Sequence, residues 1–596
     1  MIHGNETTHG NIERERDSVP CYPRRAVNGA TAAHVATAQE ELVQLTYAPM
    51  FARIDAQETI FGDLDRVKLL SMEVTWPTSP VSVRVHRNLA AEHVIAATRP
   101  FARYSGYEIL PDYSAYDDGL SLAGVTTAKE PDVELVLLDY ARYGLSGEAL
   151  GDHIVGRLRA LRSVSRAPVI VVDLPPEDER AGEVGGRLTG AAKELSSVFV
   201  AVHLDALSGE VAPVLTARAA AITGVPYTPQ ALLSLGRQLG LSWLPAALGR
   251  RVRAVALDLD GTLYEGVLGE DGVDGLRVGD SHRALHQRVV RLHRDGVFVA
   301  IVSKNEAKDV DHLFASGVLG MTKSDVDAWA VSWGQKDVAI AEVAAQLRIA
   351  PDSFVFVDDN PGELLRVSSA HPGLAVLHAA DPAITSRALA KFPGLFRFAD
   401  TGADRLRVAD MAAEAKRDAL RRSSEDPESY LRSLEVELTY GVNRAADRAR
   451  LAELSAKTNQ FSTSLRRLNE GDIAQRLEDG GSCVVSIAMK DRLSDSGIIA
   501  FVSARREGDI AVVEDICVSC RALGRGVESY MLQEGLKRVG EELVVATLQV
   551  PWTAGPRNGP ALAWLSELCG QVLADNPLDI PVPSPLPIPV AVNWVG

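Results

Sequence analysis

Cysteine and long apolar stretches are scarce in this 596-residue chain. Its five cysteines are irregularly spaced, whereas secreted domains held by disulfides carry them in a regular framework, so we expect reduced thiols. No apolar stretch reaches the roughly 20 residues that a membrane-spanning helix needs. The first residues also lack the charged and then apolar pattern of a secretion signal. We therefore expect a cytoplasmic protein that does not bind membranes.

An excess of basic residues is also absent. The chain has 62 lysines and arginines against 79 aspartates and glutamates, which gives a formal net charge of −17. General nucleic-acid binding needs a basic surface, so this composition argues against a nucleic-acid partner. Hydrophobic residues make up 46% and charged residues 24%, values typical of soluble globular domains. The length predicts several domains, since one core rarely serves more than about 300 residues.

A cysteine-based metal site is absent as well. Cys517 and Cys520 form a lone C-x-x-C pair, and zinc would need a second pair, or histidines, at matching spacing. We interpret both cysteines as structural. Cys21 lies in residues 1–40, a polar stretch without periodicity that we expect to be a disordered tail.

The sequence does contain two carboxylates placed directly after an apolar run. Residues 254–257 are β-favouring and continuous, which predicts a buried parallel strand, and Asp258, Asp260 and Gly261 follow it. The period of two in a strand puts both carboxylates on one side, where a cation such as Mg²⁺ would relieve their repulsion. An acidic turn after a strand is the simpler alternative for this motif taken alone.

Polar groups also follow two further predicted strands and open one predicted helix. They are Ser303 after the run 298–302, Lys336 at the start of a helical pattern, and Asp358 and Asp359 after the run 354–357. Strands that alternate with helices predict a Rossmann-like α/β domain, in which the strand ends meet at one edge. A hydroxyl, an ammonium and several carboxylates at that edge are the groups that phosphoryl transfer needs.

Taken in order, these motifs resemble those of the haloacid dehalogenase (HAD) superfamily. Residues 266–272, 303–306 and 356–361 resemble its FkbH-like branch more narrowly, within a central HAD domain of residues 251–396. Members of that branch load a glyceryl unit from 1,3-bisphosphoglycerate onto an acyl carrier protein. The resemblance therefore implies a magnesium-dependent phosphatase and acyl (glyceryl) transferase of polyketide or related natural-product biosynthesis.

The resemblance also implies a role for each site residue. Asp258 is the expected nucleophile and Asp260 the expected general acid–base. Ser303 and Lys336 would hold the transferring phosphoryl group. Magnesium is expected among Asp258, the backbone carbonyl of Asp260, Asp358 and the adjacent Asp359.

Three departures from the branch concern acyl transfer and the substrate pocket. FkbH-like members carry a cysteine before the Ser-Lys-Asn motif, and that cysteine is the expected thioester carrier. Here the position is Val302, which cannot hold a thioester. Residues 262–266 differ from the family, which tends to have tryptophan and glycine there, and residues 491–497 differ from the family's Phe-Gly-Asp-Asn-Gly. We therefore expect a substrate pocket that differs from that of the family.

The region before this domain, residues 41–250, alternates strand and helix patterns. Apolar runs at 133–138 and 168–172 predict strands of an α/β domain. In FkbH-like proteins this region resembles an SGNH-hydrolase fold with a flavodoxin-like sheet. The catalytic motifs of those hydrolases are missing, since Leu64 stands in place of the serine and His203 precedes its aspartate. We predict a non-catalytic docking or scaffold domain.

Residues 397–428 are charged and helix-favouring, and we interpret them as a linker helix. Residues 429–575 predict an α+β domain, with antiparallel strands near 483–487, 497–502 and 510–514. Residues 576–596 are proline-rich, and we expect them to form an extended surface tail.

A glycine-containing turn precedes the main predicted helix of this last domain. The turn Arg521-x-x-Gly524-x-Gly526 resembles the acyl-CoA site of GNAT acetyltransferases. Glycines there let backbone N–H groups approach a pyrophosphate at a helix N-terminus. A purely structural turn is the alternative. Residues 457–461 and 519–521 also resemble segments that accompany the HAD unit in FkbH-like proteins.

A docking surface for a carrier protein is a further prediction for the last domain. Carrier proteins are typically acidic, so an acidic chain must attract one through a local basic patch. The candidate residues are Arg466, Arg467, Arg505, Arg506, Arg521, Arg525, Lys537 and Arg538. A phosphopantetheine arm is the outer half of coenzyme A, so the same turn would seat its phosphate. Ordinary solvated charges are the alternative.

Three functions remain open at this point. The first is an FkbH-like enzyme that transfers an acyl unit from a phosphorylated three-carbon donor to a carrier protein. The second is an acyltransferase in which the GNAT-like domain does the chemistry and the HAD domain is a phosphatase or scaffold. The third is a non-catalytic docking protein, which the clustering of mutually repelling acids argues against.

Overall fold

The computed structural model describes residues 49–595 with short gaps, and from Met50 onward they belong to one compact unit. The gaps are 117–129, 176–177, 196, 202–213, 217, 219–221, 399–412, 414–415, 418–419, 425, 459, 520–521, 556, 575 and 586. The predicted tail, residues 1–40, therefore lies outside the described residues, together with Cys21. His203, Cys520, Arg521 and most of the predicted linker helix also lie outside them.

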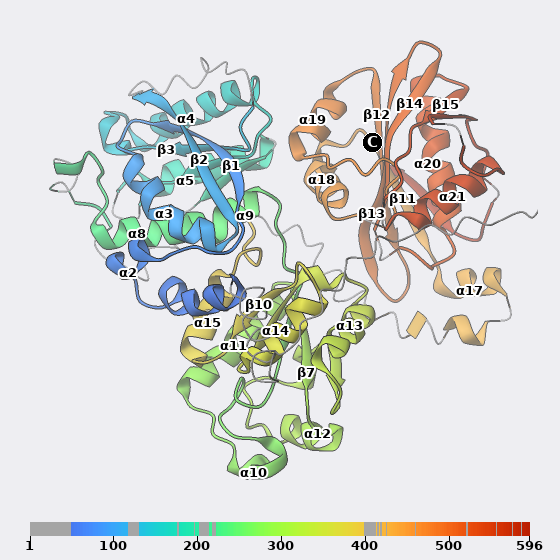
Figure 1. The fold of residues 1–596 in the computed structure, drawn as a ribbon. Coiled ribbons are helices and arrows are strands. Elements are labelled where there is room, and N and C mark those ends of the chain that lie inside the picture. The colour runs from blue at the N-terminus through green and yellow to red at the C-terminus, as the bar shows by residue number, and fades with distance from the viewer. Residues whose placement is uncertain are drawn as a thin grey trace, which may run out of the picture. The chain divides into compact units, whose positions relative to one another are not determined.

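Three β-sheets, each flanked by helices, organise the described residues (Figure 1). Two of the sheets have five parallel strands, and the third has seven strands in mainly antiparallel order. The predicted α/β multidomain architecture is confirmed. Among the helices that the structure describes, none combines the length and the apolar character needed to cross a bilayer.

The first sheet has the strand order β2-β1-β3-β4-β5, with all strands parallel. This is the flavodoxin-like order that the family resemblance implies. Apolar side chains alternate between two buried clusters, so α3 and α8 cover one face and α4 and α5 the other. The elements are β1 (Ser79–Arg87), α3 (Glu92–Tyr104), β2 (Tyr107–Tyr116), β3 (Val133–Leu137), α4 (Gly147–Arg162), β4 (Val169–Val172), α5 (Ala181–Glu194), β5 (Val198–Ala201) and α8 (Pro229–Gln238).

The second sheet has the order β10-β9-β6-β7-β8 and is also fully parallel. Its first strand, β6, lies at the centre. The chain forms β7 and β8 on one side of β6 and then crosses to form β9 and β10 on the other side. Helices α11 and α15 cover one face, and α13 and α14 cover the other. The strands are β6 (Ala254–Leu257), β7 (Phe298–Ser303), β8 (Ala328–Val331), β9 (Phe354–Asp358) and β10 (Ala375–His378). The helices are α10 (Leu268–Gly275), α11 (Asp280–Arg294), α12 (Ala307–Ser316), α13 (Lys336–Leu347), α14 (Pro361–Ala370) and α15 (Pro382–Lys391).

The third sheet has the order β16-β15-β14-β13-β12-β11-β17. The strands are β11 (Glu437–Val442), β12 (Ser482–Lys490), β13 (Asp495–Glu507), β14 (Ile510–Val518), β15 (Thr547–Val550), β16 (Leu578–Pro581) and β17 (Ala591–Val595). Helix α20 covers one face of this sheet, and α18 and α19 cover the other. The helices are α17 (Pro427–Leu434), α18 (Arg448–Lys457), α19 (Glu470–Glu478), α20 (Glu528–Leu543) and α21 (Gly559–Cys569).

The end of the chain differs from its prediction. Residues after 576 were expected to form a surface tail, but they supply β16 and β17 at the two edges of the third sheet. Leu578 and Ile580 alternate with the exposed Asp579 and Pro581 and are buried in the core, which proline content alone does not reveal. The expectation of an extended conformation is right, and that of a tail outside the domain is wrong.

Candidate active site

The predicted site residues meet at the carboxyl edge of the second sheet. Asp258 follows β6, Ser303 ends β7 and Asp358 ends β9. Strand β6 pairs with both β7 and β9, so these three residues come from neighbouring strand ends. Open parallel sheets bind ligands in the crevice at such a topological switch point. The backbone topology therefore brings together residues that are up to 100 positions apart.

A buried lysine bridges two of the carboxylates. Lys336, the first residue of α13, places its Nζ 2.9 Å from Asp258 Oδ1 and 2.6 Å from Asp358 Oδ2. All three side chains are buried. Burial by itself lowers the pKa of Lys336, but the charges of Asp258 and Asp358 outweigh burial and the pKa is raised. The lysine therefore stays an ammonium, as a residue that binds phosphoryl oxygens must.

Three carboxylates form a cluster that suits a divalent cation. Oxygen atoms of Asp258, Asp358 and Asp359 lie within 4.8 Å of one another. Burial raises the pKa of Asp258 to about 6, and Lys336 opposes that rise. Burial also raises the pKa values of Asp358 and Asp359. These raised pKa values mean that the negative charges of the cluster are unfavourable where they lie. A bound cation would neutralise them, as protonation does. Oxygen ligands of this kind fit Mg²⁺.

Gly261 gives Asp359 the space to join this cluster. Gly261 has a φ of +70°, and a Cβ on it would lie 2.4 Å from Asp359 Oδ2. Any other residue would therefore strain the backbone and displace the carboxylate. The glycine of the D-x-D-G-T motif is thus required at this position by the packing of the acidic cluster.

Asp260 is held by three hydrogen-bond donors. Its Oδ1 accepts from the Tyr264 hydroxyl at 2.7 Å and from the Leu268 backbone N–H at 2.8 Å. Its Oδ2 accepts from Asn305 Nδ2 at 2.7 Å, and the same nitrogen lies 3.1 Å from Ser303 Oγ. Neither Tyr264 nor Asn305 has a role among the sequence-based predictions. A signal for Asn305 was present, because it lies two residues after Ser303 in the Ser-Lys-Asn motif.

A small cavity opens beside these residues. It has a volume of about 340 Å³ and is lined by Asp258, Asp260, Gly261, Gly266, Val267, Lys304, Lys336, Asp359, Asn360 and Glu363. At its wall Lys304 Nζ contacts Glu363 Oε1 at 2.7 Å. Ser303 is buried and does not line the cavity directly. A volume at the low end of the usual range for ligand sites suits a small substrate.

Val302 points away from this cavity. It is fully buried in the apolar cluster beneath α13 and α14, together with Ala300 and Ile340. Ser303 is the next residue of the same strand and faces the opposite side. Position 302 therefore belongs to the core here, and Val302 does not line the acidic cavity.

The glycine turn of the C-terminal domain is already engaged by a side chain. Gly524 and Gly526 both have a φ of +82°, which explains the need for glycine. The backbone N–H groups of Arg525 and Gly526 donate to the carboxylate of Glu528, at 2.9 and 3.0 Å. These are amides of the kind expected to face a pyrophosphate, and a carboxylate occupies them instead.

The predicted basic patch is not one surface. Arg525 is buried and lies 3.2 Å from Asp491, whose carboxylate also accepts from the buried Arg417 at 2.9 Å. The prediction that Arg525 is a docking residue is therefore wrong, because it satisfies an internal carboxylate. Lys537 and Arg538 pair with glutamates of their own helix, α20.

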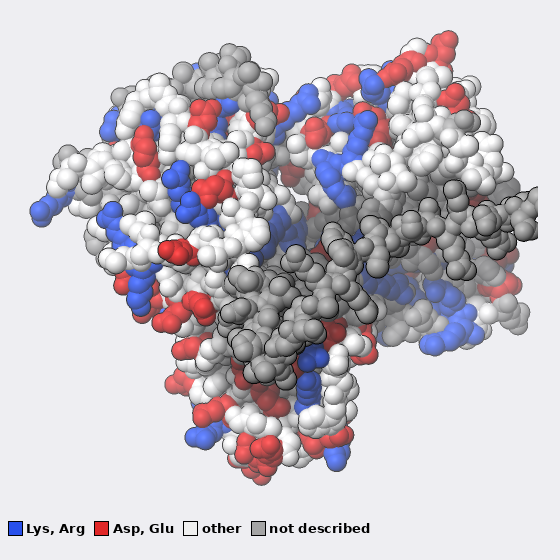
Figure 2. Space-filling model, viewed as in Figure 1, with Lys and Arg blue, Asp and Glu red and all other residues white. Residues whose placement is uncertain are grey.

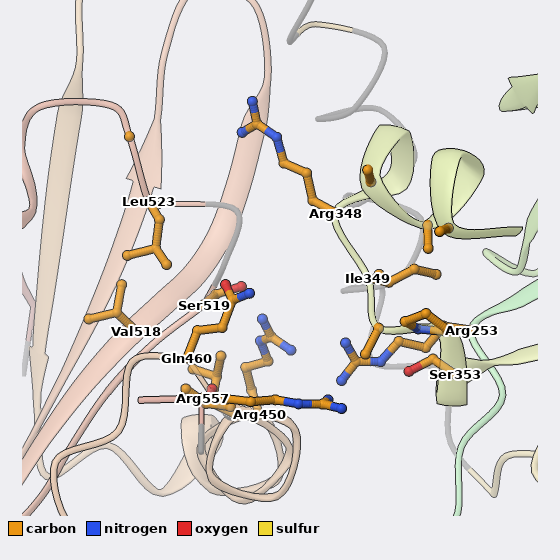
Figure 3. Close-up of a pocket in the computed structure, with 18 of the residues that line it drawn as sticks. Arg253, Arg348, Ile349, Ser353, Arg450, Gln460, Val518, Ser519, Leu523 and Arg557 are labelled. Atoms are coloured by element: carbon orange, nitrogen blue, oxygen red, sulfur yellow. The ribbon is translucent and has the colours of Figure 1, made fainter. Parts of the chain in front are cut away.

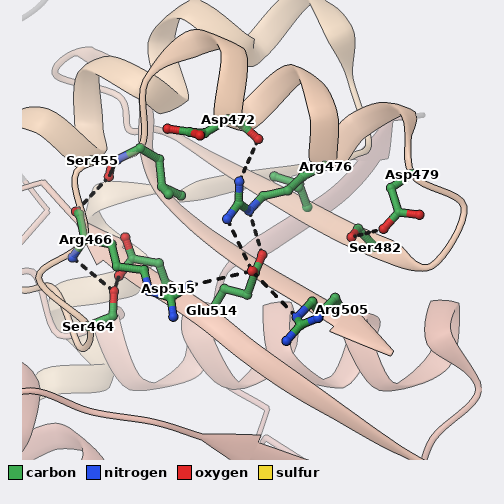
Figure 4. A network of polar contacts seen from close by, with 12 residues as sticks. Ser455, Ser464, Arg466, Asp472, Arg476, Asp479, Ser482, Arg505, Glu514 and Asp515 are labelled. Carbon is green, nitrogen blue, oxygen red and sulfur yellow. Dashed lines mark hydrogen bonds and ion pairs between the residues drawn. The ribbon is translucent and has the colours of Figure 1, made fainter. Parts of the chain in front are cut away.

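Arg466 and Arg505 do share a location, around Glu514 of β14 (Figure 4). Arg476 binds Glu514 with two nitrogens, at 2.6 and 3.2 Å, while Arg466 and Arg505 approach to 3.6 and 3.9 Å. The last two remain about half exposed. Across the face shown in Figure 2, basic and acidic side chains of the described residues are interspersed. Arg505 also pairs with Glu507, and Asp472, Asp479 and Asp515 lie close by, so basic and acidic side chains are mixed at this location.

A second and larger cavity, of about 730 Å³, lies beside the glycine turn (Figure 3). Its lining includes five arginines and no carboxylate among the described residues: Arg253, Arg348, Arg421, Arg450 and Arg557. Figure 3 shows Arg253 reaching into this space from one side, and Arg450 and Arg557 from the other. Apolar residues such as Ile349, Val518 and Leu523 complete the wall. A cavity of this composition suits a phosphorylated ligand with an apolar portion.

No protein-family model and no curated protein matches the chain. Among solved structures, the chain is similar to the N-terminal part of a Bacteroides fragilis protein that contains a phosphatase domain and was solved with Mg. The identity is 18%, the match covers 58% of this chain and 98% of that one, and the TM-score is 0.45.

Two further similarities concern single domains. A putative HAD family hydrolase from Streptomyces avermitilis is 17% identical, over 24% of this chain and 91% of that one, with a TM-score of 0.18. A mutant spermidine N-acetyltransferase from Vibrio cholerae is 15% identical, over 24% of this chain and 90% of that one, also with a TM-score of 0.18. Identities of this size establish no family membership, so the function is inferred from the chemistry of the site.

Proposed function

We propose that the chain is a magnesium-dependent phosphoryl-transfer enzyme of the HAD type. The observation that carries the proposal is the buried bridge of Lys336 between Asp258 and Asp358, with Asp359 beside them. A scaffold gains nothing from clustering three acids, two of them buried, whereas a phosphoryl-transfer site needs a nucleophile, a cation site and an ammonium.

In the first step a carboxylate oxygen of Asp258 attacks phosphorus. The new P–O bond forms an aspartyl phosphate while the bond from phosphorus to the leaving oxygen breaks. Asp260, as the carboxylic acid, gives its proton to that leaving oxygen. Lys336 holds the transferring oxygens through its ammonium.

In the second step water attacks the aspartyl phosphate. Asp260, now a carboxylate, takes the proton of that water, and phosphate and free Asp258 are released. Asp258, Asp358 and Asp359 would hold Mg²⁺, which when bound supplies positive charge to the transferring phosphoryl group.

The proposed substrate is a small phosphorylated three-carbon acyl donor of the 1,3-bisphosphoglycerate type, as in FkbH-like enzymes. The cavity of about 340 Å³ supports a small substrate. Because Lys304 is paired with Glu363, Lys336 and bound Mg²⁺ would supply the positive charge for an anionic one. In the FkbH-like reaction Asp258 would remove the ester phosphate of this donor. The thiol of an acyl carrier protein would attack the acyl carbon, so that a thioester forms while the bond to the acyl phosphate breaks and phosphate leaves. Val302 counts against a thioester stage at the usual position.

A second candidate function places acyl chemistry in the C-terminal domain, with the phosphopantetheine of a carrier protein or coenzyme A as ligand. The cavity lined by five arginines favours this candidate. Glu528 counts against pyrophosphate binding by the backbone of residues 524–526, so arginine side chains would be the main phosphate contacts. A non-catalytic role in docking a carrier is the remaining alternative.

The test of the proposed function is phosphate release by the full chain from small phosphate esters and acyl phosphates. We expect activity that requires Mg²⁺, and Asp258→Asn should lower it by several orders of magnitude while the shape of the site is kept. Asp352→Asn, which changes a surface carboxylate, is the matched control. Unchanged release by Asp258→Asn, or full activity in excess chelator, would contradict the proposal.

A further inference from the structure

Both oxygens of the Asp260 carboxylate are tied to the protein. Tyr264 Oη and Leu268 N donate to Oδ1 at 2.7 and 2.8 Å, and Asn305 Nδ2 donates to Oδ2 at 2.7 Å. Tyr264 is fully buried and Asn305 is 2% exposed, so water does not compete for these contacts. The hydrogen bonds are short enough to fix the rotation of the carboxylate.

The two oxygens are engaged unequally. Oδ1 accepts two hydrogen bonds, which use both of its lone pairs, whereas Oδ2 accepts one. Oδ2 therefore keeps a lone pair that can carry a proton. Its donor, Asn305 Nδ2, is also 3.1 Å from Ser303 Oγ, so one amide links Asp260 to the hydroxyl expected to hold the phosphoryl group.

We propose that Tyr264 and Asn305 are positioning residues that hold Asp260 with Oδ2 facing the leaving oxygen. This inference rests on the proposed function. Proton transfer needs the donor and acceptor oxygens within about 3 Å. A displacement of about 1 Å in a reacting group costs on the order of a hundredfold in rate. Without Tyr264 or Asn305 the carboxylate would rotate, and protonation of the leaving oxygen would suffer first.

This role predicts a dependence on the leaving group that a purely structural role does not. p-Nitrophenyl phosphate has a leaving group that departs without a proton, whereas glycerol phosphate releases an alkoxide that must be protonated. The first chemical step determines kcat/KM for both esters. Tyr264→Phe removes only the hydroxyl, and Asn305→Ala removes the amide. For each variant, the kcat/KM ratio of glycerol phosphate to p-nitrophenyl phosphate should fall by about 10- to 100-fold, a share of what general acid catalysis contributes.

The full chain with Mg²⁺ is used throughout, and the melting temperature of each variant is measured. Tyr140→Phe is the matched control, because Tyr140 is also buried and donates its hydroxyl to the Val172 carbonyl at 2.6 Å, in the N-terminal domain. It should leave the ratio unchanged. If Tyr264→Phe does not fold, the kcat/KM ratio of Asn305→Ala tests the inference.

Two results would overturn the inference, and they are distinguishable. If the wild-type chain is active and both variants lose activity equally on the two esters, Tyr264 and Asn305 do not position the acid, while the proposed function stands. If the wild-type chain hydrolyses no phosphate ester or acyl phosphate, the proposed function fails and this inference fails with it.

Discussion

Lys336 Nζ lies 2.6 Å from Asp358 Oδ2, so the first residue of α13 neutralises the last residue of β9. Both are buried, and the same ammonium also contacts Asp258. Removing one partner of a buried ion pair typically costs about 3–5 kcal/mol, because a charge stays behind in the core. The lysine thus stabilises the acidic cluster, and under the proposed function the same ammonium would hold the phosphoryl group.

Replacing Gly261 should weaken magnesium binding. In Gly261→Ala the new methyl group meets Asp359 Oδ2, so that carboxylate must move out of the cluster. We expect the apparent Mg²⁺ affinity to fall about 10- to 100-fold, the usual effect of disturbing groups around a metal site. The measurement is the rise of the melting temperature with Mg²⁺ concentration, which needs no activity.

The control for this experiment is Gly269→Ala. Gly269 lies in α10, and a Cβ there meets nothing within 4 Å. It should leave the Mg²⁺ response unchanged. An unchanged response in Gly261→Ala as well would mean that Asp359 takes no part in the metal site.

The protein should form no stable thioester, and Val302→Cys should not restore one. A side chain at 302 lies in the core beneath α13, so a thiol there would not reach a substrate in the acidic cavity. Intact mass after incubation with 1,3-bisphosphoglycerate measures the adduct, with hydroxylamine to test for a thioester.

Two other thiols are poor candidates for carrying such an adduct. Burial raises the pKa of Cys483 to about 12, and burial followed by the charge of Asp515 raises the pKa of Cys517. Both therefore stay protonated and weakly nucleophilic. A hydroxylamine-labile adduct on either cysteine, or on the thiol introduced by Val302→Cys, would refute the prediction.

Asp173→Asn should stabilise the N-terminal domain above pH 6. Burial raises the pKa of Asp173 to about 6 from 3.8, and the Leu174 N–H only partly opposes this. Between these two pKa values Asp173 is ionised in the unfolded chain but protonated in the folded chain. The free energy of unfolding of the domain therefore falls as pH rises through this range. Above pH 6 the loss is constant, at up to about 3 kcal/mol.

Melting temperatures of the variant and the wild type at pH 4, 6 and 8 measure this effect. Their difference should grow from pH 4 to 6 and then level off. Asp152→Asn, at an exposed position on α4, should change stability by less than about 0.5 kcal/mol at each pH. A difference for Asp173→Asn that is equal at pH 4 and 8 would contradict the prediction.

Carrier docking should depend on Arg466 and Arg505. Reversing both to Glu replaces two half-exposed positive charges beside Glu514 with negative ones, and an acidic carrier should then bind about 5- to 10-fold more weakly, an effect that added salt reduces. Binding of an acyl carrier protein by calorimetry measures this. Arg432→Glu, at an exposed position on α17, is the control. Equal affinity for the double variant and the control would move the docking surface elsewhere, with the N-terminal domain as the next candidate.

Local patterns in the sequence were sufficient to predict the strands and the polar residues at their ends. The apolar runs before Asp258, Ser303 and Asp358 predict parallel strands because continuous burial on both faces requires such runs. Residues at the ends of parallel strands converge through topology alone, so the acidic cluster and its lysine follow from the order of elements. The flavodoxin-like order of the first sheet was expected only from the family resemblance, because local patterns do not determine which strands become neighbours.

The direction and the partner of each side chain depend on tertiary structure. Asp260 is anchored by Asn305, 45 residues away, and Arg525 is buried because Asp491 lies beneath it. Glu528 takes the amides expected to bind phosphate, and Leu578 and Ile580 enter the core from a proline-rich segment. A carboxylate or guanidinium has the same composition whether it faces solvent, a ligand or another residue. Only packing, which sets burial and distance, decides which of these it contacts.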